Sequence, residues 1–292
     1  MLKNVLVFSL SNAELISKAN AIAENTVLIT AENGLSGADT VYTFNADESV
    51  VIKLNTIAKL AEELQPELIL CETCPSGRLV AGYLAAVLKT CSLPEVQTLE
   101  ITDSGLESTR MVHGGSFIKT ESMAYPAVAV VAAGVLPCDE LLRESSVKAL
   151  EGTMEGIELL DVKVSSAAHK DLAVADKVVC VGRGLGSGDN LPMVEELAGL
   201  MGAELGCTRP VAEEEGWMAK DRYIGISGVM LKSKIYLGLG VSGQMQHMIG
   251  TRSCSNIFAI NKLDNAGVIE EADYTLVGNV LTAVPAIIEK LK

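Results

Sequence analysis

Short apolar runs alternate with longer amphipathic stretches along most of this 292-residue chain, and this alternation limits the possible folds more than any other feature. The apolar runs lie at 4–9, 25–30, 40–44, 67–72, 126–134, 177–182, 203–206, 234–240 and 256–260. Helical spacing of apolar residues predicts helices at 11–24, 47–65, 77–90, 190–202 and 280–291. Because parallel strands need such long crossovers, we predict an α/β protein with parallel sheets.

The alternation stops between about 137 and 170, where charged residues mix with short apolar pieces as they do in a connector. The chain is also about twice as long as a usual domain. We therefore predict two Rossmann-like parallel-sheet domains, covering 1–170 and 171–292, of which the second is doubly wound.

The amino-acid composition limits the cellular environment and the classes of partner that we expect for this protein. Hydrophobic residues make up 49% of the chain and aromatic residues 4%, so the core must be built from Val, Leu, Ile and Ala, as in buried parallel sheets. A net charge of −14 without a Lys/Arg cluster makes nucleic acid and anionic membranes poor partners. Seven cysteines at irregular spacing fit a reducing cytoplasm. No apolar run approaches the ~20 residues of a membrane span, and 4–9 reads better as a core strand than as a signal peptide.

A glycine-rich turn follows the predicted strand 177–182 directly. Glycines occupy every second position from Gly182 to Gly188, with Arg183 after the first. The dinucleotide pattern G-x-G-x-x-G fails because its third glycine would be Ser187, and no Gly-Lys-Ser/Thr follows to make a P-loop. Glycines allow close approach of the backbone to a ligand, and successive N–H groups can bind an anion. The turn favours a phosphate-bearing ligand, although a flexible strand-to-helix loop explains it about equally well.

Polar side chains also follow the other strands of the second half. They are Thr208, Arg209, Ser227, Ser242, Gln244, Gln246, His247, Asn261 and Asp273. The carboxyl ends of parallel strands share one edge of the sheet, where ligands bind, so we expect these residues to lie together there. Neither a Cys–His pair nor a Ser–His–Asp relay is apparent. The sequence therefore predicts a site that holds a polar ligand by hydrogen bonds.

Six segments of the second half closely resemble, in order, the C-terminal domain of the α subunit of electron-transfer flavoproteins. They are "GRGLGSGDN" (182–190), "GCTRP" (206–210), "GISG" (225–228), "LGVSGQMQH" (239–247), "AINK" (259–262) and "ADYTLVG" (272–278). In the first half, "PELILCETCPSGRLVAGYLAAVL" (66–88) resembles a strand, turn and Ala-rich helix of this family, and "MVHGGSFIKTES" (111–122) resembles its next hairpin. The resemblance covers the whole chain and is strongest over 175–292.

This resemblance implies an electron carrier rather than a stand-alone enzyme. FAD would be bound by residues 171–292, and a β subunit would contact residues 1–170. The other redox partner would be an acyl-CoA-type dehydrogenase or reductase. The implied FAD-binding residues are Arg183, Gly184, Ser187, Thr208, Arg209, Ser227, Gly228, Ser242, Gly243, Gln244, Gln246, His247, Asn261, Asp273 and Tyr274.

Within this set the resemblance implies separate roles. Arg183 and its loop, together with 242–246, would face the diphosphate and ribityl region. Arg209 would sit by the flavin ring, where a fixed positive charge favours a reduced, anionic flavin. Ser227 would offer its hydroxyl to the N5 edge, and His247 would face the N1/O2 edge. The adenosine portion would be held by Asn261 and Asp273.

Several positions depart from the family pattern. Thr208 replaces the usual Ser and keeps the hydroxyl, whereas Ile226 stands where a polar Gln is frequent. Leu263 stands where Asp is usual, with Asp264 one place later, which puts the geometry of that loop in doubt. The "ISG" variant resembles the branch that serves anaerobic carnitine-type or other CoA-linked reductions.

Two other functions stay open from the sequence. One is a non-redox nucleotide-binding protein for AMP or ATP, suggested by the altered positions 226 and 263. The other is an NAD-dependent enzyme of the deoxyhypusine-synthase type, for which no convincing catalytic lysine is present.

Some residues with reactive side chains have simpler interpretations. Cys71 and Cys74 form a single C-x-x-C, which supplies too few ligands for structural zinc, so a packed turn is favoured over a redox pair. His113 and His169 have no motif context and are interpreted as structural or surface residues. The acidic run 212–217 is interpreted as a solvated loop.

Overall fold

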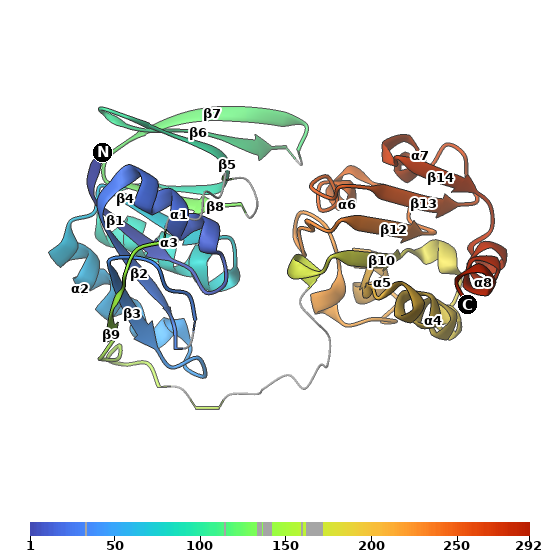
Figure 1. Ribbon diagram of the computed structural model, residues 1–292, viewed down its shortest axis with the longest axis horizontal. Coiled ribbons are helices and arrows are strands. Elements are labelled where there is room, and N and C mark those ends of the chain that lie inside the picture. The colour runs from blue at the N-terminus through green and yellow to red at the C-terminus, as the bar shows by residue number, and fades with distance from the viewer. Residues whose placement is uncertain (33, 114, 133–135, 137–141, 159, 162–171) are drawn as a thin grey trace. The chain divides into compact units, whose positions relative to one another are not determined.

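The computed structural model describes residues 1–32, 34–113, 115–132, 136, 142–158, 160–161 and 172–292. The chain forms two compact units, Met1–Ser165 and Ser166–Lys292. The predicted α/β class with Rossmann-like sheets is confirmed (Figure 1). The predicted boundary at 170 and 171 lies outside the described residues, so it stays a prediction.

The described part of the N-terminal unit contains a nine-stranded sheet in the order β7-β6-β5-β8-β4-β1-β2-β3-β9. Its strands are β1 (Leu2–Phe8), β2 (Ala23–Ala31), β3 (Thr40–Phe44), β4 (Leu68–Glu72), β5 (Ser92–Thr102), β6 (Gly105–Val112), β7 (Phe117–Ala124), β8 (Ala127–Val131) and β9 (Ser146–Ala149). The central strands are parallel and mostly buried, because helices cover both faces. Helix α1 (Ala13–Ile22) packs on one face, and α2 (Leu54–Leu64) and α3 (Pro75–Val87) pack on the other.

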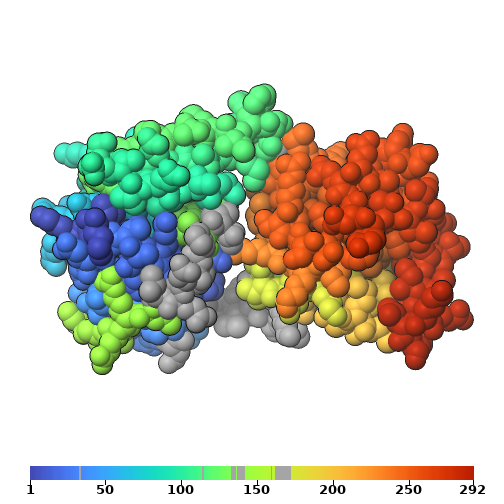
Figure 2. Space-filling view, turned by 45° about the horizontal axis from the view of Figure 1, so that its top comes forward, coloured from blue at the N-terminus to red at the C-terminus, as the bar shows by residue number. Residues whose placement is uncertain are grey.

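Two features of this unit differ from the sequence-based expectation. The sheet is mixed, because β5, β6 and β7 pair antiparallel, and the predicted hairpin at 111–122 is only the outer part of this ribbon. The ribbon forms the upper side of this unit in the space-filling view, in teal and green (Figure 2). The expected connector also contributes β9, which pairs with β3. The pairing of β9 with β3 joins segments distant in sequence, which local patterns do not report, whereas β5, β6 and β7 follow one another along the chain.

The C-terminal unit contains, among its described residues, a five-stranded parallel sheet in the order β11-β10-β12-β13-β14. The strands are β10 (Lys177–Val181), β11 (Glu204–Cys207), β12 (Ile235–Leu239), β13 (Ile257–Asn261) and β14 (Tyr274–Val277). The helices are α4 (Leu191–Met201), α5 (Arg209–Glu213), α6 (Met245–Met248), α7 (Gly267–Glu271) and α8 (Val280–Leu291). One face packs against α4, α5 and α8, and the other against α6 and α7, as in a doubly wound fold.

Local chemistry explains where several of these elements begin and end. The Asn12 side chain accepts a hydrogen bond from the Glu14 N–H and caps α1. Proline stands in the first turn of α3 and of α4, where a missing N–H costs nothing. Gly202 ends α4 at a positive φ of 61°. In the described part of the chain, no helix is long and apolar enough to cross a membrane.

Candidate functional site

A cavity of about 780 Å³ opens at the carboxyl edge of the five-stranded sheet. The segments that follow β10, β11, β12 and β13 all contribute to its lining. In the sheet order, β11 and β12 lie on opposite sides of β10, so the connections after β10 and β11 run in opposite directions. Such a topological switch point is the usual position for ligands in open α/β sheets. The predicted location of the site at this edge is therefore where the structure has its cavity.

The glycine-rich turn is built for close contact between two loops. A Cβ atom on Gly184 would lie 2.6 Å from the Gly240 Cα, and one on Gly182 would lie 2.3 Å from the Gly240 carbonyl oxygen. Gly240 itself has a φ of +63°. No side chain fits between these backbones, so three glycines allow the loops after β10 and β12 to cross at the switch point.

The backbone hydrogen bonds of these loops contradict one expectation about how the glycine-rich turn binds phosphate. The resemblance suggests that the bare backbone after β10 points its N–H groups at phosphate. In the structure, the Gly182 N–H donates to the Leu239 carbonyl at 2.9 Å and the Gly184 N–H to the Gly240 carbonyl at 3.0 Å. The Gly186 N–H donates to the Arg183 carbonyl at 3.0 Å. These three N–H groups are already used, so the expectation is wrong for them.

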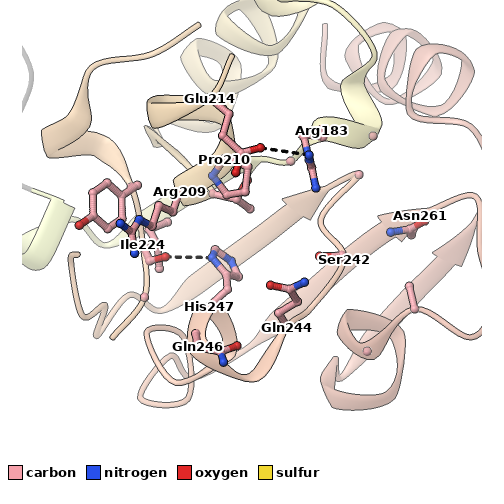
Figure 3. Close-up of a pocket in the computed structure, with 18 of the residues that line it drawn as sticks. Arg183, Arg209, Pro210, Glu214, Ile224, Ser242, Gln244, Gln246, His247 and Asn261 are labelled. Atoms are coloured by element: carbon pink, nitrogen blue, oxygen red, sulfur yellow. Dashed lines mark hydrogen bonds and ion pairs between the residues drawn. The ribbon is translucent and has the colours of Figure 1, made fainter. Parts of the chain in front are cut away.

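Free polar groups do line the cavity, but from other segments. The side chains of Thr208, Ser227, Ser242, Gln244 and Gln246 have no hydrogen-bond partner within the described residues. Figure 3 shows Ser242, Gln244, Gln246 and His247 around one space together with Arg183, Arg209 and Asn261. The backbone N–H groups of Ser242 and Gln244 likewise meet no acceptor in the part of the chain that the structure describes. Such a set of unused donors suits a polar, anionic ligand.

Both cavity arginines are paired with carboxylates at the mouth. The Nη1 atom of Arg183 lies 3.2 Å from a Glu214 oxygen, and Nε of Arg209 lies 2.6 Å from a Glu213 oxygen. The Glu213 carboxylate raises the pKa of Arg209, which stays charged. More than half of each arginine side chain is exposed, so both pairs are screened by water. Residues 213–216 are exposed, as expected for the run 212–217, but its first two residues belong to α5, and Glu213 and Glu214 form ion pairs.

His247 is buried in the wall of the cavity. Its Nδ1 atom lies 3.0 Å from the Ile224 carbonyl oxygen, which can only accept, so Nδ1 carries a proton. Its Nε2 atom lies 2.8 Å from the Tyr236 hydroxyl. Burial lowers the pKa of His247 to about 4, so the ring is neutral at pH 7. The permanent positive charges of the site therefore belong to the arginines and Lys262.

The structure brings ten of the fifteen predicted residues to this cavity. They are Arg183, Gly184, Thr208, Arg209, Ser227, Ser242, Gln244, Gln246, His247 and Asn261. Asn261 also ties two loops together, because its amide nitrogen donates to the Val241 carbonyl at 2.6 Å and its oxygen accepts from the Leu263 N–H at 3.0 Å.

Three other predicted residues lie beside the cavity but do not line it. The Ser187 hydroxyl donates to the Asp189 carboxylate at 3.0 Å and caps a short 3₁₀ turn. A Cβ on Gly228 would lie 2.3 Å from the Tyr223 carbonyl oxygen. Gly243 has a φ of +74° and packs directly against the Val268 N–H of α7. Their predicted contacts with the cofactor remain predictions, and the structure shows a packing reason for each glycine.

The expected position of Asp273 at the carboxyl edge is wrong. Asp273 precedes β14, and its carboxylate accepts a hydrogen bond from the Ile257 N–H at 2.7 Å, at the amino end of β13. Tyr274 opens β14 at the same amino edge and stacks on Phe258, with ring centroids 4.7 Å apart. The short strand β14 is not among the strands that the sequence predicts, so the residues at its amino end lie at the opposite edge from the one expected.

Several cavity residues were missed by sequence reasoning. They are Glu213, Glu214, Tyr223, Lys262 and Asn265, besides backbone of Gly240 and Gly267. Lys262 could have been predicted from the sequence, because it directly follows the strand that ends at Asn261. For the two glutamates, the short helix α5 that turns them toward the arginines follows from tertiary packing.

The corresponding edge of the N-terminal sheet is occupied by a side chain of the protein. The Glu72 carboxylate, at the end of β4, accepts hydrogen bonds from the Leu10 and Ser11 N–H groups at 2.6 and 3.0 Å. The hydroxyls of Ser9 and Ser11 donate to it at 2.9 and 2.5 Å. Burial alone would raise the pKa of Glu72, but these hydrogen bonds outweigh it and hold the pKa below its ordinary value.

The C-x-x-C pair beside Glu72 has the properties of a packed turn. Cys71 is fully buried in β4, and the Cys74 sulfur accepts the Gly77 N–H at 3.2 Å as the N-cap of α3. Burial raises the pKa of both thiols, which disfavours reactive thiolates. The described residues contain no group of three or more metal-ligating side chains.

Comparison with known proteins gives consistent matches over both units. The family described as electron transfer flavoprotein domain matches residues 7–159, and the one described as electron transfer flavoprotein FAD-binding domain matches residues 171–252. A protein of Escherichia coli K12, whose name describes an electron transfer flavoprotein subunit, YdiR, is 38% identical over 81% of this chain and 77% of its own length. Protein FixB of Escherichia coli O139:H28 is 34% identical over 95% of this chain and 94% of its own. Protein FixB of Escherichia coli strain 55989 is 34% identical over 94% and 92%.

Proposed function

The chain belongs to the electron transfer flavoprotein family as an α-type subunit, and on this premise we propose that its C-terminal cavity binds FAD. The expected family and its electron-transfer function are confirmed, and the non-redox nucleotide-binding alternative is not favoured. In this proposal the subunit carries electrons between a flavin dehydrogenase or reductase and a second redox protein.

One observation carries the proposal. Unused hydroxyl, amide and backbone N–H donors converge with two arginines at the switch point of a doubly wound sheet. A dinucleotide such as FAD needs this combination, because its diphosphate is anionic and its ribityl chain and ring edges are rich in acceptors. The donor set therefore fits FAD.

The residues divide into two groups by chemistry. Arg183 and the segment 242–246 face the diphosphate and ribityl side, where positive charge and N–H donors neutralise phosphate. Thr208, Arg209 and Ser227 face the flavin ring. The flavin supplies the redox chemistry when bound, because it accepts and returns one or two electrons. Arg209 favours the electron-rich state by its permanent charge, partly offset by Glu213.

His247 contributes differently from a fixed cation. A neutral imidazole with both nitrogens engaged by the protein orients the wall of the cavity and adds no net charge. The site therefore tunes electron uptake through Arg209 and through hydrogen-bond donors, each worth up to about 3 kcal/mol in a water-excluded position.

The proposal also covers the protein partners of this chain and its location in the cell. Subunits of this α type pair with a β subunit, which we place on the N-terminal unit. The "ISG" segment at 226–228 points to a CoA-linked or carnitine-type dehydrogenase or reductase as the redox partner. The described cysteines are all free thiols, which suits a reducing cytoplasm.

The test is coexpression of the full chain with its β subunit, followed by a visible spectrum and by identification of the released cofactor. We expect bound FAD, with reversible bleaching on stepwise reduction by dithionite. Arg209→Ala should weaken FAD retention and lower the reduction potential of the flavin.

A matched control is Arg252→Ala, which removes another exposed ion pair of the same unit, with Glu271 at 3.4 Å, outside the cavity. This variant should retain FAD as the wild type does. A colourless complex that cannot be reconstituted with FAD would refute the proposal, and tighter binding of AMP or ATP than of FAD would support the nucleotide-binding alternative.

A further inference from the structure

Three buried side chains meet on one face of the sheet, behind the cavity. Cys180 on β10 and Tyr236 on β12 are both fully buried, and the third residue, His247, lies on α6. The Tyr236 hydroxyl lies 2.8 Å from Nε2 of His247, and the Cys180 sulfur lies 3.9 Å from the same atom. Tyr236 does not line the cavity, so any effect on a ligand must act through His247.

The direction of these hydrogen bonds follows from their last acceptor. The Ile224 carbonyl cannot donate, so Nδ1 of His247 donates to it at 3.0 Å. In a neutral imidazole the other nitrogen is then an acceptor, and the Tyr236 hydroxyl donates to it. Burial favours the neutral imidazole, and it also raises the pKa of Tyr236, which keeps the hydroxyl protonated.

His247 in turn holds the loop that carries cavity residues. Its bond to the Ile224 carbonyl joins α6 to the segment 224–228, and the Ile226 N–H donates to the Gln246 carbonyl at 2.8 Å. Ile226 and Ser227 both line the cavity. The position of the Ser227 hydroxyl therefore depends on the orientation of the His247 ring.

Gly238 leaves the space that the Tyr236 hydroxyl occupies. A Cβ on Gly238, two residues along β12, would lie 3.2 Å from the Tyr236 hydroxyl oxygen. Contact at that distance is tighter than ordinary packing, so only glycine leaves the hydroxyl undisturbed. The sequence "IYLGLG" thus provides both the donor and its space.

We propose that Tyr236 is a positioning residue for the flavin site: its hydroxyl donates to Nε2 of His247, fixes the orientation of the ring with Nδ1 directed at the Ile224 carbonyl, and thereby holds the loop that presents Ser227. This inference rests on the proposed function for its effect on FAD. The hydrogen-bond arrangement itself is a property of the chain alone and can be tested without a flavin.

The first measurement is the ¹⁵N spectrum of the imidazoles in the full chain. The chain has only three histidines, at 113, 169 and 247, so His247→Gln assigns the signal. We expect a neutral ring with hydrogen on Nδ1 in the wild type. Tyr236→Phe removes the donor to Nε2, so the hydrogen should stay on Nδ1 while the Nε2 signal moves toward that of an imidazole nitrogen without a hydrogen bond.

The second measurement is FAD affinity and flavin reduction potential in the complex with the β subunit. Loss of one neutral hydrogen bond that positions the loop should weaken FAD binding about three- to tenfold in Tyr236→Phe. Gly238→Ala disturbs the same hydroxyl while keeping the tyrosine, so it should shift the Nε2 signal and the affinity in the same direction. Val178→Ala, in the same buried cluster, is the control for damage to the core, and it should leave the Nε2 signal unchanged.

The outcomes separate the two proposals. Tyr236→Phe with the wild-type Nε2 signal, or with wild-type affinity and potential, overturns the positioning role. A wild-type ring protonated on Nε2 also overturns it, even if no variant folds. A wild-type complex that binds no FAD refutes the proposed function and the flavin part of this inference, while the Nε2 signal still tests the bond between Tyr236 and His247.

Discussion

Replacing Glu72 tests whether the buried carboxylate organises the N-terminal sheet edge. Its side chain is 9% exposed and accepts four hydrogen bonds, from Leu10, Ser9 and Ser11 at the end of β1. Glu72→Gln preserves the shape and can preserve the number of hydrogen bonds, because the amide nitrogen can donate to the Ser11 hydroxyl. The variant therefore removes mainly the charge.

The expected magnitude follows from that charge. A hydrogen bond to a charged group exceeds a neutral one by about 1 kcal/mol, and burial of an amide costs less than burial of a carboxylate. With four bonds affected, Glu72→Gln should lower the free energy of unfolding by about 2 kcal/mol. Glu72→Ala leaves two N–H groups without an acceptor and should cost about 3–5 kcal/mol.

The pH dependence has a definite sign. The folded-state pKa of Glu72 lies below its ordinary value, so the carboxylate stabilises the fold at pH values above the unfolded pKa, about 4.3. This contribution is lost as the pH falls through the folded pKa. The difference in stability between wild type and Glu72→Gln should therefore be constant from pH 7 to about pH 5 and shrink below about pH 4.

Urea unfolding followed by circular dichroism measures this difference. The single tryptophan, Trp217, lies in the C-terminal unit, and its fluorescence transition should be unchanged. Glu63→Gln, on the exposed face of α2, is the control and should stay within about 0.5 kcal/mol of wild type. Equal stability of Glu72→Gln and wild type at pH 7, or a difference that grows on acidification, would refute the reasoning.

Three further predictions concern the C-terminal unit and the thiols. Gly184→Ala should destabilise that unit by about 1–3 kcal/mol and reduce its FAD content, because the added Cβ would meet the Gly240 backbone. The control is Gly199→Ala, where the added Cβ would meet open space, and this variant should be neutral or slightly stabilising in thermal unfolding. Glu213→Gln combined with Glu214→Gln should tighten FAD binding severalfold at low salt, because Arg183 at the diphosphate and Arg209 at the flavin ring both lose a competing carboxylate. Titration at low and high salt checks this, and unchanged or weaker binding would contradict it. Cys74 should react with a thiol reagent at neutral pH more slowly than the unfolded chain does, as mass spectrometry can follow.

Local sequence patterns were sufficient for most of the secondary structure. The predicted runs at 177–182, 203–206, 234–240 and 256–260 correspond to β10 to β13, because buried parallel strands read as continuous apolar runs. The parallel sheet then places the residues after these strands at one edge, which explains why ten predicted residues reach the cavity.

The errors arose where spatial partners decide the structure. The short exposed strand β14 has no apolar run, so Asp273 was expected at the wrong edge. The pairing of β9 with β3 depends on contacts between segments distant in sequence, which local periodicity does not encode.

By itself, the sequence determined the fold class, the family and the edge of the sheet at which a ligand binds, because periodicity, turn residues and motif order are local properties. Only the tertiary structure showed which groups are free there. It showed that the glycines serve the crossing of two loops, that Glu213 and Glu214 hold the arginines, and that Tyr236 stands behind His247. The physical reason is that a hydrogen bond or ion pair uses up a polar group, and its partner is chosen by packing between segments far apart in the chain.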